Sequence, residues 1–171
     1  AKYFTYFIAH ALMLQVQNIV LLLLEDVQPE VRIQAGKVLS GLLHCKFVPA
    51  PMELLEIFKQ KAKTKLKRSA THKKSQKNGV NLSVSTRHAG VLGMCAFISS
   101  HPYDVPDYLP NIFGELGAHL NDPQPIPTTI RKTLGDFKRT HHDNWEVHKL
   151  KFTEEELSVL SDLTVPPSYY A

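Results

Sequence analysis

Three segments of this 171-residue chain repeat one pattern, and this repetition limits the fold more than any other feature of the sequence. In each segment an arginine precedes a glycine by three or four residues, and apolar residues recur around them at helical spacing. The three glycines, 54 and 45 residues apart, are Gly36, Gly90 and Gly135. The aligned apolar residues are Val31, Ala35, Val38, Leu39 and Leu42, then Val91, Leu92, Cys95 and Ile98, then Ile130, Leu134 and Phe137. The pattern predicts three amphipathic helices.

A second helix is expected after each of these three. Their apolar positions are Leu54, Leu55, Phe58 and Ala62, then Leu109, Ile112, Phe113, Leu116 and Leu120, then Leu157, Leu160 and Leu163. At the start of the last helix, Thr153 and Glu156 have the spacing of a capping box. A leading helix is expected from Tyr3 to about Glu25. The weak alternation over residues 80–84 is interpreted as the end of a loop.

Helix pairs at a period near 45 residues are typical of HEAT repeats, in which stacked pairs bury apolar faces that no pair can bury alone. Residues 26–32 add an Asp-x-x-Pro-x-Val-Arg turn before the first repeated helix. We therefore predict an all-α, HEAT/armadillo-like solenoid of antiparallel helix pairs over residues 1–164, with a short extended tail at 165–171. The repeated glycines are expected at helix–helix contacts, and the longer first interval is attributed to an insertion at about 59–80.

The composition agrees with a globular domain, because 43% of the residues are hydrophobic and 21% are charged. Cys45 and Cys95 lie in apolar helical patterns without a CxxC motif, so both are expected in the core of a protein from a reducing compartment. The apolar run at 19–24 is too short to cross a bilayer. The chain begins without Met inside an expected helix, which suggests a piece of a longer protein.

Nine of the 20 basic residues lie within residues 59–77, where there is no acid. We call this stretch the basic segment; its cations are Lys59, Lys61, Lys63, Lys65, Lys67, Arg68, Lys73, Lys74 and Lys77. It is expected to be disordered over about 67–80. Three interpretations remain open: a solvated loop, a nuclear localisation signal, or a site for polyanions such as inositol phosphates. Because no aromatic residue lies among the cations, recognition of nucleic acid by base stacking is not expected, nor is sequence-specific binding.

The chain ends in an aromatic pair and a free carboxylate, Tyr169-Tyr170-Ala171. Pro166 and Pro167 stop any preceding helix, so this tail is expected to stand away from the domain. Each ring offers a large apolar area on few rotatable bonds, which favours burial in a partner. The alternative is that the rings fold back onto their own domain.

Residues that suggest metal binding or catalysis are few. His141, His142 and Asp143, with His148 nearby, form the densest histidine cluster. Adjacent residues of a helix point roughly 100° apart, so the two neighbouring histidines are not expected to share an ion. Motifs of a nucleophile, a phosphate loop or paired catalytic carboxylates are missing from the sequence. We expect no enzyme activity, no metal and no cofactor.

The helical repeats and the end Ser168-Tyr169-Tyr170-Ala171 resemble the large single-chain HEAT-repeat proteasome activators. The family's C-terminal motif is a hydrophobic residue, a tyrosine and any residue, and Tyr169, Tyr170 and Ala171 match these three positions. The resemblance covers the whole chain. It implies a dome that caps the proteasome core particle and promotes turnover of small proteins and acetylated histones without ATP, in the nucleus and cytoplasm, with roles in DNA repair and spermatogenesis.

The resemblance implies three roles for the tail. The Ala171 carboxylate pairs with a lysine between α-ring subunits, Tyr169 fills an apolar slot, and Tyr170 shifts the gate towards opening. It also implies an acetyl-lysine-reading, bromodomain-like region near this end, but no pocket can be assigned from Asn18, Tyr3 and Tyr6. The alternative function is a HEAT-repeat scaffold or importin-like binding module with no proteasome role.

Overall fold

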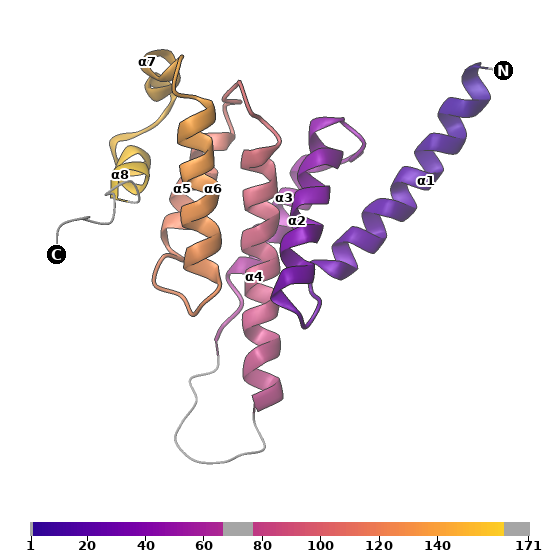
Figure 1. The fold of residues 1–171 in the computed structure, drawn as a ribbon, viewed down its shortest axis with the longest axis horizontal. Helices are drawn as coiled ribbons and strands as arrows, with labels where there is room; N and C mark the ends of the chain where they lie inside the picture. Colours follow the sequence, from indigo (N-terminus) through magenta and orange to yellow (C-terminus); the bar gives the residue numbers. More distant parts are fainter. Residues whose placement is uncertain (1, 67–76, 163–171) are drawn as a thin grey trace. The chain divides into compact units, whose positions relative to one another are not determined.

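The computed structural model describes residues 2–66 and 77–162, and it is all-α, as predicted (Figure 1). No strand occurs in these two ranges. Clustering of contacts divides the chain into two compact units, residues 1–96 (unit 1) and 97–171 (unit 2), with the boundary inside α4. The elements are α1 (Lys2–Leu23), α2 (Pro29–His44), α3 (Pro51–Ala62), α4 (Lys77–Ser99), α5 (Leu109–Gly117), α6 (Ile126–Thr140), α7 (Trp145–His148), the 3-10 helix η1 (Lys149–Lys151) and α8 (Glu154–Asp162).

In unit 1 the short loops reverse the chain, so that α2 and α3 run antiparallel (Figure 1). The turn before α2 forms for local reasons. The Asp26 carboxylate accepts the Gln28 N–H at 2.8 Å, and Pro29 occupies the first helical turn, where its missing N–H costs nothing. α1 packs on α2, and Val20 of α1, Leu24 directly after α1 and Leu39 of α2 are all buried. This arrangement of antiparallel helices joined by short turns is the HEAT/armadillo type that the sequence predicted.

Glycines allow the helices of unit 1 to approach closely. A Cβ on Gly36 would lie 3.3 Å from Leu92, and a Cβ on Gly90 would lie 2.6 Å from the Phe58 carbonyl oxygen. Both positions were predicted as helix–helix contacts, and both are confirmed. Gly93, which the repeat pattern did not identify, is equally tight, because a Cβ there would overlap the Phe58 ring. The α3–α4 contact therefore depends on two glycines one turn apart.

Unit 2 is built around a cluster of aromatic rings. The Phe113 ring lies 4.9 Å from the Phe137 ring and 5.2 Å from the Phe152 ring, in edge-to-face arrangements that aromatic pairs prefer. α8 packs on α5, and its predicted capping box is present. The Thr153 N–H donates to Glu156 at 2.8 Å, and the Glu156 N–H donates to Thr153 Oγ1 at 3.3 Å.

Several expectations for individual residues are wrong. A Cβ on Gly135 would meet nothing within 4 Å, so this glycine makes no helix–helix contact. Val38 is 48% exposed on α2. Cys45, at the C-terminal cap of α2, is exposed rather than in the core, whereas Cys95 is buried as expected. Residues 77–80 belong to α4, so disorder was wrongly expected there, and 80–84 is helix rather than loop.

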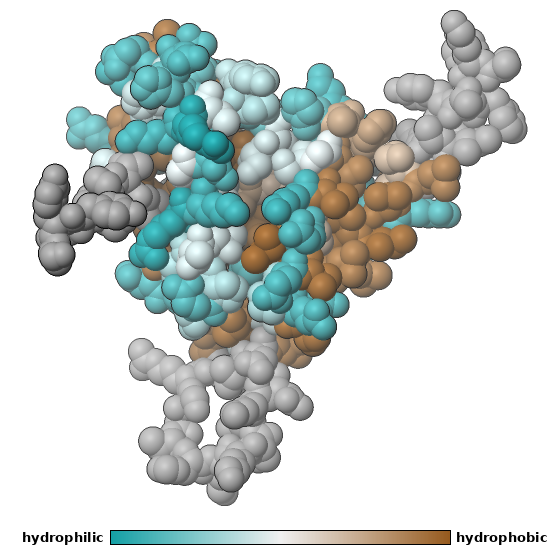
Figure 2. Space-filling model, in the orientation of Figure 1, coloured by the Kyte–Doolittle hydropathy of each residue, from teal (hydrophilic) through white to brown (hydrophobic). Residues whose placement is uncertain are grey.

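Part of the apolar run at the end of α1 faces outwards. Ile19 and Leu22 are 56% and 76% exposed, whereas Val20 and Leu24 are buried. Figure 2 shows the corresponding hydrophobic surface over unit 1. None of the helices within 2–66 and 77–162 combines the length and the hydropathy that a membrane span requires. Leu120 lies beyond the end of α5, and Leu163 lies outside the described residues.

Candidate functional site

The described residues contain only part of the predicted sites. Tyr169, Tyr170 and Ala171 lie outside them, and so does the tail at 165–171 as a whole. In the basic segment, Lys67, Arg68, Lys73 and Lys74 also lie outside. The backbone of Lys77 starts α4. The side chains that can be placed are those of Lys59, Lys61, Lys63 and Lys65.

Acids from outside the basic segment pair with its first two lysines. Lys59 Nζ lies 2.9 Å from the Glu56 carboxylate one turn earlier on α3. Lys61 forms an ion pair with Glu25, at the end of α1. Each pair is partly exposed, so each stabilises the fold by a fraction of a kcal/mol up to about 1 kcal/mol. The first two lysines therefore contribute less unopposed charge than the sequence alone suggested.

Arg87 anchors the chain just after α3. Its Nε and Nη2 donate to the Thr64 carbonyl oxygen at 2.9 and 2.6 Å. A charged donor satisfies this carbonyl, which lies beyond the last helical residue Ala62 and has no place in a helical ladder. Lys63 and Lys65 flank the anchored Thr64 and are exposed. The anchor holds the start of the basic segment against α4.

A buried polar network joins α2 to α4 within unit 1. Arg32 is 3% exposed, and its Nε donates to His88 Nδ1 at 3.0 Å. Its Nη1 donates to the Asp26 carbonyl at 2.6 Å and to Ser85 Oγ at 3.1 Å. The arginine of the repeated motif thus closes the turn that precedes its own helix, which explains its position in the sequence.

This network requires a neutral His88. Nδ1 accepts a hydrogen bond from Arg32 and must therefore carry no proton. Burial, with a smaller contribution from the nearby Arg32 charge, lowers the pKa of His88 to about 4. Burial likewise lowers the pKa of Arg32, against the opposing effect of Asp26 and Glu30. The arrangement is suited to holding helices together rather than to exchanging protons near neutral pH.

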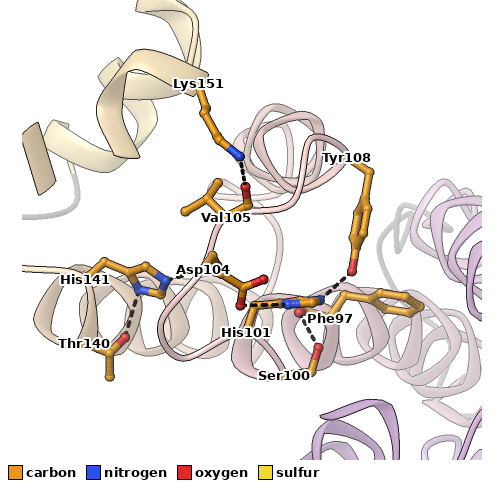
Figure 3. A network of polar contacts seen from close by, with 9 residues as sticks. All are labelled: Phe97, Ser100, His101, Asp104, Val105, Tyr108, Thr140, His141 and Lys151. Carbon is orange, nitrogen blue, oxygen red and sulfur yellow. Dashed lines mark hydrogen bonds and ion pairs between the residues drawn. The ribbon is translucent and has the colours of Figure 1, made fainter. Parts of the chain in front are cut away.

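A second polar network organises residues 100–108 in unit 2 (Figure 3). His101 Nδ1 lies 3.2 Å from the Asp104 carboxylate, and its Nε2 lies 2.7 Å from the Tyr108 hydroxyl. Because a carboxylate only accepts, Nδ1 donates to Asp104; in the tautomer that carries only this ring proton, Nε2 accepts from the Tyr108 hydroxyl. Lys151 Nζ reaches across from η1 and donates to the Val105 carbonyl at 2.6 Å. These contacts fix a loop that has no regular secondary structure.

The Asp104–His101–Tyr108 chain does not produce an activated tyrosine. Burial raises the pKa of Tyr108, and the Asp104 charge raises it further. A nucleophilic or basic tyrosine requires the opposite shift, because its ionised form must be accessible near neutral pH. The chain of contacts is therefore structural in character.

The predicted histidine cluster does not converge on one point. His141 is buried and stacks on Phe137 with ring centroids 4.0 Å apart, and its Nε2 lies 3.3 Å from the Asp104 carbonyl oxygen. The adjacent His142 side chain is 84% exposed. Burial lowers the pKa of His148, and the neighbouring His141 and Lys151 lower it further, against the opposing effect of Asp104. Within the described parts of the chain, no three His, Cys, Asp or Glu side chains are grouped to hold a metal.

Sequence patterns missed most of these polar contacts. Arg32 and Arg87 could be recognised as repeated arginines, but their partners His88 and Thr64 lie 56 and 23 residues away in the sequence. Lys151 is one of several lysines near the end of the chain, and nothing in the pattern marks it. Partners at such separations depend on how helices pack, which the local pattern does not contain.

Comparisons with known proteins identify the family. The family model "Proteasome activator complex subunit 4-like, C-terminal" matches residues 84–171. The chain is 50% identical over 158 residues to zebrafish (Danio rerio) proteasome activator complex subunit 4A, covering 91% of this chain and 9% of that protein. It is 48% identical over 158 residues to human proteasome activator complex subunit 4, covering 90% of this chain and 8% of the human protein.

A more distant relative is the proteasome activator BLM10 of Saccharomyces cerevisiae. It is 28% identical over 145 residues, which cover 83% of this chain and 6% of the yeast protein. The chain thus spans less than a tenth of the length of these three relatives. The matched family residues include all of unit 2 and most of α4. The chain belongs to the proteasome activator complex subunit 4-like family, as a representative of its C-terminal region.

Proposed function

We propose that this chain is the C-terminal module of an ATP-independent proteasome activator, which docks on the α-ring of the core particle and promotes gate opening. The observation that carries the proposal is the family match over residues 84–171, which extends to the last residue. Relatives from fish, human and yeast are all named proteasome activators. The module acts by binding rather than by catalysis.

The chemistry of Tyr169, Tyr170 and Ala171 suits insertion between α subunits. The Ala171 carboxylate pairs with a pocket lysine, in a charge-assisted contact that is strongest when partly desolvated. Tyr169 fills an apolar slot beside it. Tyr170 places its hydroxyl against the turn that keeps the gate closed, and shifts the gate only through its different affinities for the closed and open states.

The test uses the longest natural form of the protein that carries this segment. Tyr170→Phe is expected to retain most docking on core particles but to reduce peptide hydrolysis by the core. One residue added after Ala171 is expected to weaken both, because the carboxylate is displaced. Tyr103→Phe is the matched control, since Tyr103 is 79% exposed elsewhere in unit 2. Normal docking and activation by the extended form would contradict the proposal and favour the scaffold or importin-like alternative.

The family resemblance extends the proposal to acetylated histones. A neutral acetyl-lysine fits an apolar slot with one buried donor, whereas an unmodified lysine must lose the hydration of its charge. Asn18, one of the residues considered for this role, is exposed on α1. Titration of the chain with acetylated and unmodified histone peptides tests the idea. Equal binding of both would remove it.

The basic segment is proposed to bind compact anions such as inositol phosphates or to assist nuclear import, with the protein present in nucleus and cytoplasm. Support comes from nine cations without an acid among residues 59–77. Binding is expected to weaken steeply with salt, because exposed charges are screened. Replacing Lys63 and Lys65 with glutamine leaves the Lys59–Glu56 and Lys61–Glu25 ion pairs in place. If neither anion binding nor nuclear accumulation changed on neutralising the whole segment, it would be a solvated loop.

A further inference from the structure

Gly135 stands at the centre of four basic residues on the outer face of α6. On an α-helix, the positions three and four residues before and after a residue are its surface neighbours. For Gly135 these positions hold Arg131, Lys132, Lys138 and Arg139, and all four side chains are exposed. We call these five residues the Gly135 ring. The opposite side of α6 carries its buried residues Ile126, Pro127, Ile130, Leu134 and Phe137.

Packing within the fold does not require this glycine. A Cβ at position 135 would meet nothing within 4 Å, and the residue has no positive φ angle. In the interior of a helix, glycine costs about 0.5–1 kcal/mol of stability relative to alanine. Among the recognised uses of glycine, the close approach of something outside the fold is the one that is compatible with this position.

Gly41 shows what distinguishes the ring. It also lies within a helix, is exposed and has nothing within 4 Å of its Cβ position. Its four surface neighbours are Lys37, Val38, His44 and Cys45, which share no chemistry. An open glycine alone therefore suggests no ligand. At Gly135 the open position coincides with four cations.

The charges around the ring favour carboxylates over a dense polyanion. Asp136 lies beside the ring, and its carboxylate accepts from Arg139 Nη2 at 2.9 Å. Asp143 and Glu146 follow α6 and are exposed. These three acids lower the net positive charge around the ring, which weakens the long-range attraction on which nucleic acid binding depends. Short-range pairing of arginine with individual carboxylates remains strong, because the guanidinium binds them through two parallel hydrogen bonds.

We propose that the Gly135 ring is a docking surface for an acidic segment of a partner protein. The two basic rows, Arg131 with Lys138 and Lys132 with Arg139, lie about 100° apart around the helix. Between them the missing side chain of Gly135 leaves room for the partner's backbone, so that carboxylates on both of its sides reach a basic row. Figure 2 shows that the surface over α6 is predominantly hydrophilic. This inference is independent of docking by the C-terminal tail.

The first test asks whether binding depends on the open position at Gly135 and not only on the net charge of the chain. The probe is fluorescein-labelled hexaglutamate, titrated against the whole chain by anisotropy at low ionic strength. Gly135→Leu fills the centre of the ring without changing the net charge, and we expect about tenfold weaker binding through steric exclusion. Gly41→Leu is the matched control, expected to change binding less than about twofold. Thermal melting of both variants verifies that they are folded.

The second test separates the ring from the basic segment. Carbodiimide coupling joins peptide carboxylates directly to lysines, and mass spectrometry then identifies the coupled positions. We expect coupling at Lys132 and Lys138, reduced by Gly135→Leu but not by Gly41→Leu. In the same titration, Arg131→Gln combined with Arg139→Gln should weaken binding about tenfold, whereas Lys37→Gln at an exposed site on α2 should leave it unchanged.

Four outcomes would overturn the proposal. These are no measurable binding of hexaglutamate, equal binding by Gly135→Leu and Gly41→Leu, coupling confined to lysines of the basic segment, and preferential occupation of the ring by tripolyphosphate or duplex DNA. The last would show a phosphate site in place of a protein-docking surface. None of these measurements involves the proteasome, so their failure is distinguishable from failure of the proposed function.

Discussion

Gly90 in unit 1 and Gly135 in unit 2 hold equivalent positions in the sequence repeat, yet the structure uses them in opposite ways. A Cβ on Gly90 would lie 2.9 Å from the Ala62 Cα atom, whereas a Cβ on Gly135 would contact nothing. The first glycine lets two helices meet at their backbones, and the second leaves a gap on an exposed basic face. Equivalent positions in a repeat therefore both lie within a helix, but the residues that surround them differ. The environment decides what a glycine does.

The strongest test of this difference is the substitution Gly90→Leu. The side chain would have to displace the α3 backbone at Phe58 and Ala62, which cannot move as a side chain can. We expect the free energy of unfolding to fall by about 3 kcal/mol, the upper range for overpacking a core. Urea denaturation followed by circular dichroism measures it. Gly135→Leu is the control, and equal losses in both variants would show that the two positions are alike.

The polar core of unit 1 predicts a loss of stability in acid. Because the pKa of His88 is about 4 in the fold and 6.5 in the unfolded chain, the unfolded state binds the proton more readily. Stability linked to His88 is complete above pH 6.5 and is lost as the pH falls towards 4, by at most roughly 3 kcal/mol. When the free energy of unfolding is measured by denaturation at several pH values, its dependence on pH should be shallower for His88→Gln than for the unchanged protein. Identical slopes in both proteins would contradict the assignment.

Gly117 tests whether contact matters more than repeat position. It lies outside the repeated motif, but a Cβ there would lie 2.9 Å from a Val159 methyl group of α8. The neighbour is the end of a side chain and can shift, so we expect Gly117→Ala to destabilise by about 1 kcal/mol. Thermal denaturation of the whole chain, followed by the fluorescence of Trp145 in unit 2, measures the change. A gain in stability would mean that the α5–α8 contact adjusts freely.

The smallest change in stability is expected for a substitution at Gly135, and it is a gain in place of a loss. Gly135→Ala should stabilise the chain by about 0.5–1 kcal/mol, because alanine is the better helix former and nothing obstructs its methyl group. Urea denaturation is again the measurement, with Gly41→Ala expected to give a gain of the same size. A loss of stability at Gly135 alone would indicate a contact within the fold.

Local patterns were sufficient to predict helices and their caps. The spacing of Ile130, Leu134 and Phe137 predicted the buried side of α6, and Thr153 with Glu156 predicted a capping box that the structure confirms. Failures occurred where a residue's neighbours belong to another element. Val38 fits the apolar stripe of α2 but is exposed, and the start of α4 at 77–84 has too few apolar residues to be recognised as helix.

The helical class, the repeat, the arginine-bearing turn before α2 and the family could all be read from the amino-acid sequence, because each is encoded by residues close together in the chain or by similarity along its length. Helix packing, in contrast, sets the contacts of Arg32 with His88, of Lys61 with Glu25, and of Gly93 with Phe58. It also decided that Gly135 is open. The physical reason is that periodicity assigns a residue to a side of its own helix, whereas the partner on that side is selected by how several helices pack together.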